Sequence, residues 1–167
     1  MTSLTWDRHQ GHAWSYDVVA TGYNYRIDEI RSALGRVQLD KLDVNNARRR
    51  ALTALYRELL AELCPPLGLP FDGHPGISAH HIMPVLLPRG TDRIRFMERM
   101  KAAGIQTSIH YPPVHTFSAY RDGAVGADHL PLTDEIAARE VTLPLYPTLT
   151  EEQVQLVVQA AAKALGD

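Results

Sequence analysis

Hydrophobic residues recur at three- and four-residue steps from about residue 28 to residue 63, the spacing of one face of an α-helix. The pattern changes phase near residues 42–45, where Asp43 is placed to cap a second helix. We therefore predict either two consecutive helices or one kinked helix. The apolar positions form two stripes: Ile27, Ile30, Leu34, Val37 and Leu42, and then Leu52, Leu55, Tyr56, Leu59, Leu60 and Leu63.

Short strand patterns follow this helical region. Residues 80–87 are predicted to form a strand that is buried on at least one face, and residues 105–110 alternate and are predicted to form a second strand. Pro84 lacks a backbone N–H, which places the first strand at a sheet edge or at a bulge. Residues 142–147 are predicted to form a further short strand or turn.

Helical patterns separate these strands. Thr91 is predicted to cap one helix and Gly104 to close it, and a second helix is predicted at 131–140. A last helix follows the capping box at residues 150–153. The order of elements predicts an α/β fold of the α+β sandwich kind, in which helices cover a small, mostly antiparallel sheet.

Composition indicates an ordinary globular protein. The chain has 167 residues, of which 45% are hydrophobic and 22% charged, and its net charge is −2. This balance gives no reason to expect nucleic-acid binding. Cys64 is the single cysteine, so no intrachain disulfide is possible. Residues 1–21 show no periodicity, and we expect the aromatic side chains Trp6, Trp14 and Tyr16 to pack against another surface.

Neither a membrane nor a nucleic acid is an expected partner. No apolar run approaches the ~18–20 residues that span a bilayer. The polar segment Met1–Tyr16 is unlike a signal peptide, so we expect a cytoplasmic location. The basic run Arg48–Arg50 lies inside a predicted helix without flanking aromatic residues, which favours a solvated face or salt bridges between subunits.

The turn at residues 22–26 runs directly into the first helix and combines polar and aromatic groups. Backbone N–H groups and the helix macrodipole favour an anion at a helix N-terminus. Arg26 adds a planar fork that fits phosphate or carboxylate, and Asn24 adds a neutral donor. The alternative is that Tyr23 and Tyr25 pack in the core and Arg26 caps a carbonyl group.

His110 and Tyr111 form a second candidate site. They end a predicted strand and precede Pro112 and Pro113, which make the following loop rigid. His110 could bind a hydroxyl or phosphate group, and Tyr111 could donate through its phenol. The alternative is a structural histidine.

Metal and hydrolase chemistry are both disfavoured. His80 and His81 are adjacent, so on a strand they would face opposite ways, and the chain has no HExxH spacing. Ser108, His110 and Asp122 could be grouped as a nucleophile set. However, no Gly-x-Ser-x-Gly elbow is present, and residues two apart on one strand face give poor geometry for proton transfer.

Three motifs together resemble the DegT/DnrJ/EryC1/StrS family of pyridoxal-phosphate-dependent sugar aminotransferases of fold type I. The first is residues 22–29 with residues 33–39, the second is residues 104–115, and the third is residues 143–147 before a Thr-Glu-Glu helix. The resemblance extends from about Asp17 to Leu165. It implies an arm and a contacting turn at 1–26 and the small C-terminal domain at 27–167.

The resemblance also assigns roles to residues. Asn24 would contact the phosphate of pyridoxal phosphate in a neighbouring subunit, and Arg26 would reach a nucleotide-sugar substrate. His110 and Tyr111 would line the substrate site across a dimer interface, with His115 close by. Thr116-Phe117-Ser118 stands where the family has a Gln-Pro pair, which leaves the sugar contacts open.

The chain does not contain the lysine that binds the cofactor covalently in this family. Its lysines are Lys41, Lys101 and Lys163, and none lies in the family's Ser-x-x-Lys setting. We therefore expect that this chain alone is inactive and completes the active site in trans. The alternative is a non-catalytic remnant that binds sugar nucleotides or acts as a scaffold.

Three origins fit such a chain: a fragment of a longer frame, one half of a split enzyme, or a decayed relative. A homodimer or larger assembly is expected, because helices that pack against a further domain in the family would leave apolar surface exposed here. A separate chain carrying the pyridoxal-phosphate domain is the other expected partner.

Overall fold

A computed structural model describes residues 23, 25–71, 73–121 and 130–166 of the chain. The chain divides into two compact units, Met1–Asp40 and Lys41–Asp167. The predicted arm, with its aromatic residues Trp6, Trp14 and Tyr16, lies outside the described residues. The division at residue 26 therefore stays a prediction.

The first unit contains helix α2, which spans Glu29–Asp40. The helix begins there because the Asp28 carboxylate accepts a hydrogen bond from the backbone N–H of Arg31 at 2.8 Å, as an N-cap residue does. The helical pattern breaks at Lys41 and resumes at Leu42, so the first of the two predicted alternatives, two helices, is confirmed. No residue of α2 is buried.

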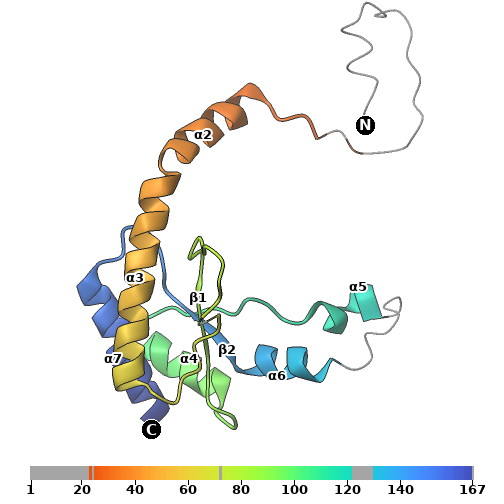
Figure 1. The fold of residues 1–167 in the computed structure, drawn as a ribbon. Coiled ribbons are helices and arrows are strands. Elements are labelled where there is room, and N and C mark those ends of the chain that lie inside the picture. Colours follow the sequence, from red (N-terminus) through yellow and green to blue (C-terminus); the bar gives the residue numbers. More distant parts are fainter. Residues whose placement is uncertain (1–22, 24, 72, 122–129, 167) are drawn as a thin grey trace, which may run out of the picture. The chain divides into compact units, whose positions relative to one another are not determined.

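Helix α3 (Leu42–Leu63) opens the second unit and carries the second predicted stripe. The predicted cap at Asp43 is wrong, because Asp43 already lies in the first turn and Lys41 occupies the cap position without a side-chain bond. The stripe packs against α7 (Glu151–Gly166), which lies beside α3 in Figure 1. The buried residues of α3 are Leu52, Thr53, Tyr56 and Leu60.

Two helix starts test the predicted caps. Helix α4 (Arg93–Ala102) packs against α7, and it is capped by Asp92, which accepts from the backbone N–H of Arg95 at 3.1 Å, rather than by Thr91. The capping box before α7 is confirmed. The Gln153 side chain accepts from the Thr150 N–H at 2.9 Å, and the Thr150 hydroxyl accepts from the Gln153 N–H at 3.2 Å.

The sheet of the second unit consists of β1 (Met83–Leu86) and β2 (Glu140–Leu143), which pair antiparallel with Pro84 opposite Thr142. In the part of the chain that the structure describes this sheet has two strands, so the edge position predicted for Pro84 is confirmed. The missing N–H is tolerated because the backbone N–H and C=O of Thr142 both bond to Ser108 instead.

The strand predicted at residues 105–110 is wrong. It is reduced to one bridge, between Ser108 and Thr142. In an antiparallel ladder the next hydrogen-bonded pair would be His110 and Glu140. The backbone N–H of His110 donates instead to the side chain of Glu140, at 2.9 Å, so the ladder stops after one residue pair.

The hydrophobic core lies between the sheet and helices α3, α4 and α7. Val141 and Leu143 of β2 point into it, as does Val85 of β1. Three further helices follow the bridge at Ser108: η1 (Val114–Thr116), α5 (Ser118–Arg121) and α6 (Pro131–Arg139). The largest fully buried side chains are Tyr56, Phe96, Leu52, Leu60, Leu87 and Met100.

Candidate functional site

His110 lies two residues beyond the bridge at Ser108, where the chain leaves β2. Its backbone N–H donates to Oε2 of Glu140, and its Nδ1 lies 2.8 Å from the hydroxyl oxygen of Thr142. The Thr142 hydroxyl in turn donates to Oε1 of Glu140. His110 is thus held at its backbone and at its ring by two neighbouring side chains of one strand.

Glu140 and Thr142 are functional candidates that the sequence analysis missed. They face the same side of β2, opposite to Val141, because side chains alternate along a strand. Both are buried, with 7% and 5% of their surface exposed. Two polar residues at alternate positions of an otherwise apolar strand are a usable signal. That signal was hidden because Glu140 ended a helical pattern.

Tyr111 extends the candidate site toward solvent. The rings of His110 and Tyr111 meet edge to face with centroids 4.7 Å apart. His110 is half-buried, whereas 72% of Tyr111 is exposed. The imidazole is therefore held by Thr142, and the phenol is exposed at the surface. This arrangement can present both groups to a bound polar molecule.

His115 has a different anchor from His110. It lies in η1, and its Nε2 is 2.9 Å from Oδ1 of Asp134 in α6. Asp134 is about half exposed. The structure brings His110 and Tyr111 together through their rings, but it ties His115 to another helix.

The turn before α2 differs from its prediction in one respect. Asp28 places its own carboxylate at the N-terminus of α2 and also pairs with the Arg31 guanidinium at 3.4 Å. The N-terminus of α2 thus already holds the Asp28 carboxylate, and the anion-binding roles of Arg26 and Asn24 stay predictions. Arg26 is exposed at the turn, and Asn24 lies outside the described residues.

The alternative prediction for the two tyrosines of this turn is wrong. Tyr23 and Tyr25 are 78% and 80% exposed, so neither packs in a core of the described chain. Their rings lie 5.7 Å apart in a tilted arrangement. The turn therefore presents two aromatic rings and the Arg26 guanidinium outward.

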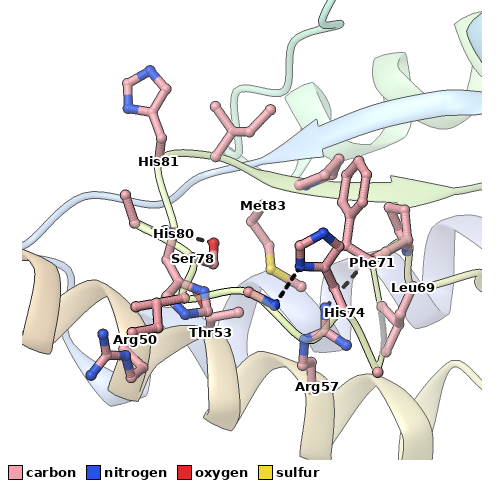
Figure 2. A pocket seen from close by; sticks show the side chains of 17 residues that line it. Arg50, Thr53, Arg57, Leu69, Phe71, His74, Ser78, His80, His81 and Met83 are labelled. Carbon is pink, nitrogen blue, oxygen red and sulfur yellow. Dashed lines mark hydrogen bonds between the residues drawn. The ribbon is translucent and has the colours of Figure 1, made fainter.

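A separate groove of about 790 Å³ lies between α3 and the loop before β1 (Figure 2). Arg57 donates to the carbonyl of Pro70 at 3.1 Å, and Nδ1 of His74 accepts from the Gly76 N–H at 2.9 Å, so both side chains hold the loop. Burial, together with the positive charges of Arg50 and Arg57, lowers the pKa of the His80 imidazole.

The basic groups of this groove do not converge on one point. Arg50 and Arg57 are seven residues apart on one helix, which separates their Cα atoms by about 10 Å along the axis. Figure 2 shows His81 pointing away from the other labelled side chains. The groove therefore lacks the focused positive charge of an anion site.

The three lysines do not fit covalent attachment of pyridoxal phosphate by this chain. A lysine that forms such a bond is activated by removal from water or by a neighbouring cation in a pocket. Lys41, Lys101 and Lys163 are all exposed. The described residues also contain no cluster of histidine, cysteine, aspartate or glutamate that could hold a metal ion.

Among the described residues, no helix combines the length and the apolar character that crossing a bilayer requires.

The fold has counterparts in solved structures. DesV from S. venezuelae, solved in complex with a ketimine intermediate, is 34% identical with a TM-score of 0.80. The alignment covers 96% of this chain and 42% of DesV. The sugar aminotransferase CalS13 from Micromonospora echinospora is 29% identical with a TM-score of 0.78, covering 94% of this chain and 40% of CalS13.

This chain spans about two fifths of the length of DesV and of CalS13. The sequence pattern of the DegT/DnrJ/EryC1/StrS aminotransferase family matches residues 2–162. The chain belongs to this family. Spr1654 from Streptococcus pneumoniae, solved in a PLP form, has the same fold at 23% identity, with a TM-score of 0.78 over 92% of this chain and 39% of its own.

Proposed function

We propose that this chain is the C-terminal part of a pyridoxal-phosphate-dependent nucleotide-sugar aminotransferase and supplies substrate-binding groups to an active site completed in trans. The observation that carries the proposal is the fixed imidazole of His110 beside the exposed phenol of Tyr111. Membership of the family and the likeness to CalS13 support it.

When bound, pyridoxal phosphate would carry the amino group between an amino acid and a keto-sugar and would stabilise negative charge as an electron sink. The residues of this chain bind and orient the sugar nucleotide. His110 and Tyr111 have hydrogen-bonding groups for sugar hydroxyls, and Arg26 has a guanidinium that fits the diphosphate. Asn24 is proposed to contact the cofactor phosphate of the neighbouring subunit, and His115 to stand near the sugar with a weaker claim.

A second copy of the chain, or a chain with the pyridoxal-phosphate domain, is the proposed partner of α2. Ile30, Leu34 and Val37 lie at helical spacing on this helix, and each is more than half exposed. An apolar stripe of this kind favours association. Sedimentation at micromolar concentration should give a dimer or larger species, and Leu34→Glu should shift it toward monomer. A monomeric wild-type chain would contradict this part of the proposal.

The substrate class is tested by titrating the chain with dTDP-glucose and UDP-N-acetylglucosamine while NMR follows the side chains. We expect shifts at His110 and Tyr111 that inorganic phosphate does not reproduce. His81, which is exposed, serves as the reference that should not move. Equal shifts at all histidines, or none, would contradict the proposed binding site.

Inactivity of the chain alone is tested with pyridoxal phosphate followed by borohydride. We expect no cofactor to be fixed on one lysine, because Lys41, Lys101 and Lys163 are exposed and none is set in a pocket that removes it from water. Specific reduction of the cofactor onto a single lysine would overturn the proposal that a partner chain supplies the cofactor-binding lysine. A chain that binds the sugar nucleotides but never associates with a lysine-bearing partner would instead fit the non-catalytic remnant.

A further inference from the structure

The hydrogen bonds around His110 restrict where its ring proton can lie. A carboxylate only accepts hydrogen bonds, and a threonine hydroxyl has one proton to donate. Oε2 of Glu140 already accepts from the His110 backbone, and Oε1 faces the Thr142 hydroxyl. The hydroxyl must therefore give its single proton to Glu140.

The hydroxyl oxygen of Thr142 is then left as an acceptor toward the ring. Nδ1 of His110 lies 2.8 Å from that oxygen, so Nδ1 carries the proton. The opposite arrangement would turn the Thr142 proton toward Nδ1 and leave two oxygen lone pairs facing each other. Because Thr142 and Glu140 are buried, water cannot readily supply the missing proton, so the opposite arrangement is disfavoured.

We propose that Glu140 and Thr142 are positioning residues that hold neutral His110 with its proton on Nδ1, so that Nε2 presents a hydrogen-bond acceptor to a hydroxyl group of the sugar. Within the described part of the chain, Nε2 makes no hydrogen bond. The identity of the hydroxyl-bearing ligand rests on the proposed function. The position of the proton does not, because it follows from the three side chains alone.

The geometry of β2 explains how two side chains of one strand can set the proton position on His110. Glu140 and Thr142 stand on one face at alternate positions, opposite the core residues Val141 and Leu143. The bridge at Ser108 fixes the chain that carries His110 beside them. In a continued ladder the backbone carbonyl of Glu140 would accept the His110 N–H. Here the Glu140 carboxylate accepts it, and this contact fixes the position of His110.

His115 provides an internal comparison in the same loop. Its Nε2 faces the Asp134 carboxylate, which only accepts, so neutral His115 carries its proton on Nε2. The two histidines are therefore expected to be opposite tautomers. A spectrum that resolves both contains its own reference.

The experiment is a long-range ¹H–¹⁵N correlation spectrum of the ¹⁵N-labelled 167-residue chain at about pH 8, well above the ordinary histidine pKa of about 6.5. His110→Gln and His115→Gln assign the two rings. We expect a protonated Nδ1 and a bare Nε2 for His110, and the reverse for His115. A protonated Nε2 in wild-type His110, or an averaged pair of signals, would overturn the proposal.

Three variants separate positioning from mere packing. Thr142→Ser keeps the hydroxyl and should keep the tautomer, whereas Thr142→Val removes the acceptor and should release the ring to an averaged state. Glu140→Gln should reverse the tautomer, because its amide oxygen takes the His110 N–H and its NH₂ donates to Thr142, which then donates to Nδ1. An unchanged tautomer in both Thr142→Val and Glu140→Gln would refute the positioning role.

A variant that does not fold, or a chain that does not bind the nucleotide sugar, can be told apart from a wrong tautomer of His110. Circular dichroism checks each variant, and where a variant does not fold the wild-type tautomer decides the question by itself. Titration with dTDP-glucose should then perturb Nε2 of His110 more than its Nδ1. If the tautomer is as expected but the nucleotide sugar does not affect Nε2, the positioning stands and the proposed function fails.

Discussion

His110 and His115 stand five residues apart in one proline-containing loop, yet the fold holds them in different ways. His110 is held by Thr142 and Glu140, which are buried on a strand. His115 is held by Asp134, which is about half exposed on a helix. The difference shows that the surroundings of a histidine, and not its place in a motif, decide how firmly its ring is fixed.

The energetic consequence follows from the solvent around each anchor. An exposed ion pair or charged hydrogen bond competes with water and contributes little, about 0–1 kcal/mol. A buried acceptor that serves two donors cannot be replaced by water, so its loss leaves both donors unpaired. We therefore expect the His110 anchor to matter for stability and the His115 anchor to matter little.

Replacement of the two anchoring carboxylates should give the largest contrast. Glu140→Ala removes the acceptor of the His110 N–H and of the Thr142 hydroxyl, and we expect a loss of about 3 kcal/mol in the free energy of unfolding. Asp134→Ala is the matched control, and its loss should stay below about 1 kcal/mol. Urea unfolding monitored by circular dichroism measures both. Equal losses would remove the distinction between the two anchors.

Thr142 links Glu140 to His110, and its replacement should have an intermediate effect on the free energy of unfolding. Thr142→Val keeps the shape of the side chain but leaves Nδ1–H of His110 and Oε1 of Glu140 without their partner, at a cost of about 1–2 kcal/mol. Thr142→Ser retains the hydroxyl and should lose less. If the valine variant proved as stable as the wild type, the hydroxyl would not be the link between strand and ring.

The sequence shows some parts of this arrangement and hides others. Helix α7 and its capping box at Thr150 follow from local spacing, because the bonds of the box join residues three apart and those of the helix join residues four apart. The anchors do not, because Glu140 lies 30 residues from His110 and Asp134 lies 19 from His115. Glu140 was assigned to the end of a helix, since only the folded chain brings a donor to its carboxylate.

The same limit explains two differences near the candidate sites. The alternating pattern at residues 105–110 predicts a strand, but the Glu140 side chain of β2 accepts the backbone N–H that would have continued it. The turn before α2 offers free helix N–H groups in the sequence pattern, but the Asp28 carboxylate accepts one of them. In both places a carboxylate side chain took a backbone donor for which the sequence pattern predicted another partner.

The stability losses of Asp134→Ala and Glu140→Ala should also respond differently to salt, by a smaller amount than the contrasts above. Raising the ionic strength from about 0.01 M to about 1 M shortens the Debye length from about 30 Å to about 3 Å. The stability difference between wild type and Asp134→Ala should then fall toward zero, because that contact is exposed. The difference caused by Glu140→Ala should change by less than about 0.5 kcal/mol, since a buried contact is screened far less. Parallel urea titrations at the two salt concentrations decide the matter.

A third histidine extends the comparison with the smallest expected effect. His80 has arginines near it instead of a carboxylate, and burial together with Arg50 and Arg57 lowers the pKa of its imidazole. The unfolded chain therefore binds a proton on this residue before the folded chain does. Stability should decrease as the pH falls below about 6.5 and level off once it is below the lowered pKa.

His80→Asn tests this sign because asparagine tolerates the positive φ of 48° that His80 adopts. The variant should lose less stability between pH 7 and pH 5 than the wild type loses. Arg50→Gln should move the NMR titration midpoint of His80 upward, because one of the two repelling charges is gone. An unchanged midpoint would exclude Arg50 as a cause and leave burial and Arg57 to account for the lowered pKa of His80.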